Sequence, residues 1–136
     1  MTVTAGVPYE LDLPADAAWL QVGRTFGASV AAVADVQPDD AEDLALALSE
    51  GLSAIIALRD IAPADGGIRV TAHRDGRLHV RIEDLGESHA GVKDSDHLVT
   101  ISDVGMARLD VVRALFDDLH VATTQTARLL LTFSVP

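Results

Sequence analysis

The sequence predicts an α/β two-layer sandwich, with three helices packed on one face of a mixed, mostly antiparallel sheet. Several segments alternate apolar and polar residues, as half-buried strands do, and others carry an apolar residue every three or four positions, as helices do. Their order is strand, two helices, two strands, a long loop, one helix and two strands. Helices on one face of a sheet satisfy this order, because their apolar stripes then cover the apolar side of the strands. The length suits a single domain, 1–136.

The first half of the chain is expected to hold one strand and two helices. Residues 7–13 alternate in the strand pattern, and Pro14 and Asp16 then open a helix over 17–34, because both residues are favourable in a first helical turn. Pro38 and the two acids after it begin a second helix, over 39–59. The apolar residues expected on the core side of the first helix are Trp19 or Leu20, Val22, Phe26, Val30 and Val33. Those expected on the core side of the second are Leu44, Leu48, Gly51 or Leu52, and Ile55.

Residues 68–84 predict a β-hairpin after the turn-rich segment 60–67. Ile68, Val70 and Ala72 should share one face with the apolar residues of the returning strand, Leu78, Val80 and Ile82. Pairing Ala72 with Leu78 meets that condition and leaves residues 74–76 as a three-residue loop. Gly76 would be free there to adopt the left-handed conformation that such loops need.

The second half begins with a segment, 86–103, in which neither period persists. A loop of that length in a compact domain is usually functional or mobile. A helical stripe resumes over 106–119, through Leu109, Val112, Leu115 or Phe116, and Leu119. Two strands then close the chain, around 121–123 and 127–135.

Composition excludes several classes of function. The formal net charge of −11 comes from 21 acidic against 10 basic residues, so the surface repels nucleic acid and favours a basic partner, unless the acidity serves solubility alone. The sequence contains no cysteine, which excludes disulfides and thiolate metal sites. No apolar run is long enough for a membrane helix, and the first ten residues lack a signal core. We therefore expect a cytoplasmic protein that binds neither membrane nor nucleic acid.

No catalytic or metal motif of the common kinds is present. The five histidines lack the i, i+4 and H-x-E spacings of metal sites, so exposed strand and loop positions are the better interpretation. Walker-type loops and G-x-S-x-G elbows are also absent from the sequence.

One polar residue on the second predicted helix calls for an explanation. Glu50 lies off the apolar stripe among small residues, and an ordinary solvated carboxylate is one interpretation. The surrounding segment, LALALSEGLSAII, resembles a helix of the GHKL (histidine-kinase-like) ATPases, specifically of the serine kinases that act as bacterial anti-sigma factors. In that family the Glu of Leu-x-x-Ala-Val-Ser-Glu-Ala-x-Thr-Asn-Ala is the catalytic base, and the Asn binds magnesium. Glu50 matches the base, whereas Ala54 stands at the Asn position and cannot hold a metal.

The resemblance extends to the family's glycine boxes, in incomplete form. Of Asp-x-Gly-x-Gly after the hairpin, where the Asp accepts the adenine amino group, Asp84 and Gly86 match and Ser88 replaces the second glycine. Of Gly-x-Gly before the third helix, Gly105 remains and Ala107 replaces the second glycine. The Gly-Thr before the last strand is replaced by Thr126 and Ala127. The order of predicted elements and the segment DVVRALFDDL also match the family.

This resemblance implies two principal functions. In the first, the chain is an anti-sigma-like binding module without ATP turnover that holds a sigma factor and is released by an anti-anti-sigma (STAS-type) protein. In the second, it is an active serine kinase that phosphorylates that protein, with ATP and Mg²⁺ as cofactors. A third alternative keeps nucleotide binding through Asp84 as a signal only. Family members are commonly homodimers, and Arg24 is the arginine nearest to their sigma-contacting position.

Overall fold

The computed structural model describes residues 8–61, 63–88, 106–124 and 128–136. Its helices are α1 (Leu20–Val33), preceded by a 3-10 turn at Ala17–Trp19, α2 (Pro38–Ile61) and α4 (Met106–Leu115). Its strands are β1 (Tyr9–Leu13), β2 (Ala64–Asp65), β3 (Ile68–Asp75), β4 (Arg77–Asp84), β5 (Glu87–Ser88), β6 (His120–Thr123) and β7 (Leu129–Val135). The expected order is confirmed, apart from the short pair β2 and β5, which no alternation predicted.

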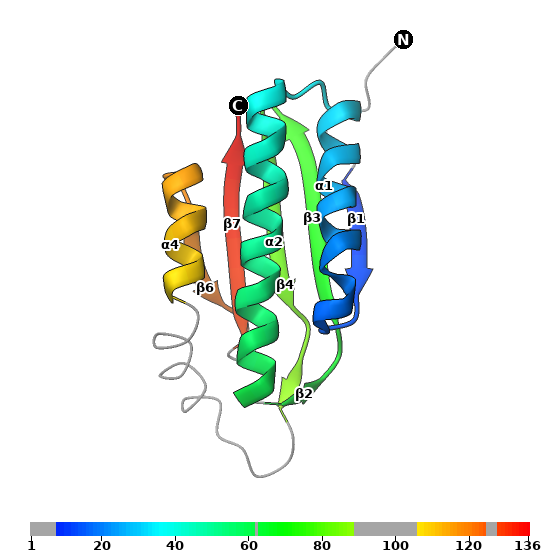
Figure 1. The fold of residues 1–136 in the computed structure, drawn as a ribbon, viewed down its shortest axis with the longest axis vertical. Coiled ribbons are helices and arrows are strands. Elements are labelled where there is room, and N and C mark those ends of the chain that lie inside the picture. The colour runs from blue at the N-terminus through cyan, green and yellow to red at the C-terminus, as the bar shows by residue number, and fades with distance from the viewer. Residues whose placement is uncertain (1–7, 62, 89–105, 125–127) are drawn as a thin grey trace.

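The main sheet is antiparallel throughout, so the prediction of a mixed sheet is wrong. Its five strands lie in the order β1-β3-β4-β7-β6, and each neighbouring pair is antiparallel. The cause is visible in Figure 1: α1 and α2 run in opposite directions, so the chain returns to the end of the sheet where β1 finished before it starts β3. The three helices lie on one face of this sheet, as predicted.

The helix starts follow the capping chemistry of the sequence. Asp16 accepts a hydrogen bond from the backbone N–H of Ala18 at 2.9 Å, which caps the turn before α1. Pro38 is the first residue of α2, and Asp39 and Asp40 lie in its first turn, where the positive end of the helix dipole favours carboxylates.

The core lies between the helix layer and the inner face of the sheet. The predicted stripe of α2 is buried, as are the predicted inner residues of β3, β4 and β7. Residues of α4 and of the turn after it complete the core, and the rings of Phe116 and Phe133 stack with their centroids 4.9 Å apart. Leu119 is buried although α4 has already ended at Leu115.

The prediction for the core face of α1 is correct in part: Val30 is buried, and Leu20 and Phe26 pack against the core. Trp19, Val22 and Val33 are exposed, and the buried residues of α1 are Gly23, Gly27, Val30 and Ala31. A Cβ at Gly27 would lie 2.6 Å from Cδ1 of Leu48, so the missing side chain is what lets α1 approach α2 closely. Small residues therefore form the contact of α1 with α2, whereas Val22 and Val33 stay outside the core.

The β3–β4 hairpin is present, but in a different register from the predicted one. Ala72 pairs with Val80 instead of Leu78, and Asp75 pairs with Arg77. Gly76 alone forms the tip, and its φ of 71° is the left-handed conformation expected for it. Moving the register by two residues leaves every side chain on the same face, so the apolar pattern cannot distinguish the two registers.

The predicted loop at 86–103 lies outside the described residues, except for its first three residues. Of these, Glu87 and Ser88 form β5, which pairs with β2. Within the described ranges, no helix combines the length and apolar character needed to cross a bilayer.

Candidate functional site

Glu50 projects from the middle of α2 toward α4. Nη1 of Arg108, in the first turns of α4, donates a hydrogen bond to Oε2 of Glu50 at 3.2 Å. The Glu50 side chain keeps 23% of its surface exposed, and the Arg108 side chain 48%. Glu50, the base that the sequence resemblance implies, is thus held by a cation from the neighbouring helix in a position that solvent still reaches.

Ala54, which the sequence resemblance aligns with a magnesium-binding Asn, is buried in the core. Only 1% of its surface is exposed, and it belongs to the same apolar cluster as Ile55 and Leu58. A methyl group offers no ligand atom, and its surroundings suit an apolar side chain.

Asp84 ends β4, and its carboxylate has no exposed surface. Oδ1 accepts hydrogen bonds from Nη2 of Arg59 at 2.5 Å and from the backbone N–H of Gly86 at 2.8 Å. Oδ2 lies 3.3 Å from Nε of Arg128. A carboxylate without hydration must be paired with a cation and hydrogen-bonded. The two arginines supply the charge, and Arg59 and the N–H of Gly86 supply hydrogen bonds. We refer to Asp84, Arg59 and Arg128 as the buried ion cluster.

Arg59 reaches Asp84 from the last turns of α2 and is itself fully engaged by the chain. Its Nη1 donates to the carbonyl oxygens of Ala64 at 3.1 Å and Gly66 at 2.8 Å, and its Nη2 donates to the carbonyl oxygen of Gly67 at 3.2 Å. The planar guanidinium group therefore joins the end of α2, the loop after it and the end of β4 in one rigid arrangement.

Gly86 is required by the Arg59 side chain in this structure. A Cβ built at Gly86 would lie 2.6 Å from Nη2 and 2.8 Å from Cζ of Arg59. The Asp-x-Gly segment thus closes around a guanidinium group, at the carboxylate for which the sequence resemblance implies an adenine contact.

Arg128 approaches the cluster from the start of β7 and is completely buried. Its backbone closes the turn from β6: its N–H donates to Oγ1 of Thr124 at 3.1 Å, and its carbonyl oxygen accepts from the N–H of Thr124 at 2.7 Å. The cluster consequently ties α2, β4 and β7 together at one end of the sheet.

The sequence did not point to Arg59 or Arg128. Arg59 looks like an ordinary cation at the carboxyl end of a helix, where the dipole favours one, and Arg128 like an outward residue in a strand. They lie 25 and 44 residues from Asp84. Only the fold brings them to that carboxylate.

The other candidate residues are distributed as follows. Gly105, Thr126 and Ala127 lie outside the described residues. Ala107 is exposed in the first turn of α4, and Ser88 pairs with Ala64 in the short β2–β5 ladder. Arg24 is exposed on α1, and among the described residues it makes no ion pair.

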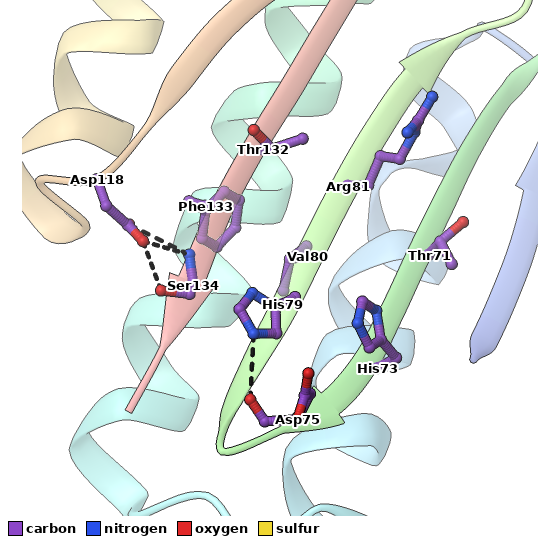
Figure 2. Close-up of a pocket in the computed structure, with 10 residues that line it drawn as sticks. All are labelled: Thr71, His73, Asp75, His79, Val80, Arg81, Asp118, Thr132, Phe133 and Ser134. Carbon is purple, nitrogen blue, oxygen red and sulfur yellow. Dashed lines mark hydrogen bonds between the residues drawn. The ribbon is translucent and has the colours of Figure 1, made fainter. Parts of the chain in front are cut away.

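A second candidate region lies on the face of the sheet that the helices leave open. It is a hollow of about 480 Å³ over β3, β4 and β7. Figure 2 shows the side chains that line it. At one side, Asp118 accepts hydrogen bonds from the backbone N–H of Ser134 at 3.1 Å and from its hydroxyl group at 2.5 Å. Partial burial raises the pKa of Asp118, but the hydrogen bonds from Ser134 and the charge of Arg77 outweigh it and hold this pKa below its ordinary value.

Two histidines occupy the centre of this hollow. His73 and His79 have ring centroids 5.2 Å apart and planes inclined by 26°. No group of three or more metal-binding side chains occurs in the described part of the chain.

In comparisons with known proteins, no family model matches the chain and no curated protein is significantly similar to it.

Proposed function

We propose that this chain is a regulatory binding module of the anti-sigma-factor kinase type that does not turn over ATP. Its partners would be a sigma factor, an anti-anti-sigma (STAS-type) protein, or both. The observation that carries the proposal is the pairing of Asp84 with Arg59, because this carboxylate is the group that would have to accept an adenine amino group.

The buried ion cluster argues against nucleotide binding in two ways. An adenine would have to displace Arg59 from Asp84, and the guanidinium group would then lose its bonds to a charged partner. Such bonds contribute more than neutral hydrogen bonds, about 1.5–3 kcal/mol each. The space beside Gly86 is also filled, because the guanidinium group of Arg59 occupies the place that a side chain at Gly86 would take.

The groups that phosphoryl transfer requires support the same proposal. Glu50 is paired with Arg108, and Ala54 supplies no oxygen in a position buried in the core. Phosphoryl transfer depends on a metal that neutralises the phosphates, and the related kinases hold that metal through the residue that Ala54 replaces.

Calorimetric titration of the purified chain with Mg²⁺-ATP tests the loss of nucleotide binding. We expect no binding in the low micromolar range, with or without Mg²⁺. A low-micromolar dissociation constant would contradict the proposal and favour the active serine kinase. Transfer of radiolabelled phosphate to a STAS-type protein would then test that alternative directly.

Partner binding is tested with purified sigma factors and STAS-type proteins from the same genome. We expect at least one to bind the chain, and Arg24→Ala on the exposed side of α1 to weaken a sigma complex. Arg113→Ala is the matched control, because Arg113 is an exposed arginine on α4 whose contact is with Asp110 of the same helix. Absence of binding to every candidate would contradict the partner assignment while leaving the nucleotide result intact.

A further inference from the structure

The observed hairpin register makes His73 and His79 direct cross-strand partners. In the register expected from the sequence, His73 would have faced Arg77, and the two imidazoles would have been separated. The spacing rules for metal sites consider residues along one strand or helix, so they do not detect a pair across two strands. Both side chains point to the open face of the sheet (Figure 2).

The separation of the two rings suits ligation of one metal ion. Metal–nitrogen bonds of about 2.0–2.1 Å place the centroids of two imidazoles on one tetrahedral ion about 5 Å apart. The observed separation is 5.2 Å. The ring planes are inclined by 26°, and rotation about the Cβ–Cγ bond of His73, a broad torsion for histidine, can turn one of its nitrogens toward the ring of His79.

A backbone contact already fixes one of the two rings. Nε2 of His79 lies 3.3 Å from the carbonyl oxygen of Asp75. A carbonyl oxygen only accepts, so Nε2 carries the proton and Nδ1 carries the lone pair in the neutral ring. Metal-binding histidines commonly donate their other N–H to a backbone carbonyl in this way, which orients the ring and increases its basicity.

The surroundings of the pair favour a cation. The carboxylates of Asp75 and Asp118 line the same hollow, and the chain carries a net charge of −11. Arg81 also lines the hollow and opposes this field, but it lies 3.3 Å from the carboxylate of Glu83. Imidazole prefers late first-row metals, and the absence of cysteine excludes a thiolate site for them.

We propose that His73 and His79 form a two-histidine site for a divalent transition metal, with water completing the coordination. Cu²⁺ binds most tightly, ahead of Ni²⁺ and Zn²⁺, following the general order for nitrogen ligands. The metal joins β3 to β4 close to the hairpin tip. This site is independent of the buried ion cluster, which lies at the end of β4 away from that tip.

The test is a titration of the full chain, free of any histidine tag, with Cu²⁺, Ni²⁺ and Zn²⁺. We expect one tight site, and His73→Asn and His79→Asn should each weaken Cu²⁺ binding by about tenfold or more. His120→Asn is the matched control, because His120 lies on the same sheet face opposite Thr132, and no other histidine of the described ranges pairs with it. Electron paramagnetic resonance of the Cu²⁺ complex should show two coupled nitrogens in the parent chain and in this control.

Thermal unfolding of the same variants separates binding from misfolding. Cu²⁺ should raise the Tm of the parent chain and of His120→Asn, and should leave the Tm of the double variant H73N/H79N unchanged. Equal Cu²⁺ affinity of the parent chain and the double variant would overturn the proposal. A signal from a single nitrogen in the parent chain would overturn it as well.

Discussion

Two arginine–aspartate contacts in this protein use the same guanidinium nitrogens, Nε and Nη2, in opposite surroundings. On the open face of the sheet, Arg69 of β3 donates two hydrogen bonds to Asp12 of β1, from Nε to Oδ1 at 2.8 Å and from Nη2 to Oδ2 at 3.0 Å. At the end of the sheet, Arg59 donates hydrogen bonds to Asp84, from Nη2 to Oδ1 at 2.5 Å and from Nε to the same oxygen at 3.1 Å. The first pair is exposed, whereas the second has almost no contact with water.

This comparison shows that burial, more than geometry, decides what such a contact does. An exposed pair exchanges contacts with water for contacts with each other at little net gain, and salt screens it. Water does not reach a buried pair, so removal of one partner leaves the other charge buried without compensation, which is strongly destabilising. We therefore expect Arg59 and Asp84 to determine whether this end of the fold forms, and Arg69 and Asp12 to matter little.

The largest effect is expected from Arg59→Met, which removes one cation of the buried ion cluster at similar side-chain volume. We expect the free energy of unfolding to fall by about 3–5 kcal/mol, toward the lower value because Arg128 still contacts Asp84. Urea denaturation at constant m-value measures it. Arg113→Met, on the exposed side of α4, is the control and should change little.

A triple variant separates the cost of an unpaired charge from the value of the cluster. R59M/D84L/R128M replaces all three charges with apolar side chains and should recover most of the stability that Arg59→Met loses. A triple variant less stable than Arg59→Met would show that the hydrogen bonds of Arg59 to the backbone of residues 64–67 matter more than its charge.

The cluster also shows where prediction from the sequence stops. Period and capping residues predicted the helices, the strands and the inner face of β3, β4 and β7, because these depend on neighbours along the chain. The register of the hairpin was missed, since it depends on the turn geometry. The contact of Gly23 and Gly27 with α2 was missed as well, because it depends on side chains of the other helix.

The candidate site divides in the same way. Glu50, Ala54 and Asp84 were identified from a resemblance in local sequence motifs, but the partners of the two carboxylates come from other elements. Arg108 reaches Glu50 across 58 residues, and Arg59 reaches Asp84 across 25. No local pattern encodes such contacts, so a resemblance in sequence motifs does not predict the partners of these side chains.

The next effect in size is expected from Gly86→Ala, which disturbs the buried ion cluster by volume instead of charge. The new methyl group would press on the guanidinium group of Arg59, which its bonds to three carbonyl oxygens hold in place. We expect a loss of about 1–3 kcal/mol by denaturation, the range for overpacking. In a double-mutant cycle, the loss should shrink when Arg59 is already Met. Additive losses would show that Gly86 acts independently of Arg59.

Asp118 lies between the two extremes, because its carboxylate is exposed but bonded to the buried Ser134. Its pKa is lower in the folded chain than the ordinary value of 3.8, so its contribution to stability is complete above that value. The contribution is lost as pH falls below 3.8 and through the lower native pKa. Denaturation midpoints of the parent chain and Asp118→Asn should therefore differ at pH 6 and converge toward pH 2. A constant difference would show that the carboxylate's charge is not what stabilises the contact.

The smallest effect is expected from the exposed pair, in Asp12→Asn and in Arg69→Met. The hydrogen bond and charge of Arg69 lower the pKa of Asp12, and Asp12 raises the pKa of Arg69. The depressed pKa of Asp12 means that its contribution is present at neutral pH and is lost below the ordinary value of 3.8, as the group is protonated. Because both side chains are in water, any difference from the parent chain at pH 7 should disappear when salt is raised from about 0.05 M to 1 M, where the Debye length falls to about 3 Å. Arg59→Met provides the contrast, since screening by salt does not reach a buried charge, and its deficit should persist at both concentrations. If the deficit of Arg69→Met also persisted in 1 M salt and matched that of Arg59→Met, burial would not be the property that distinguishes the two contacts.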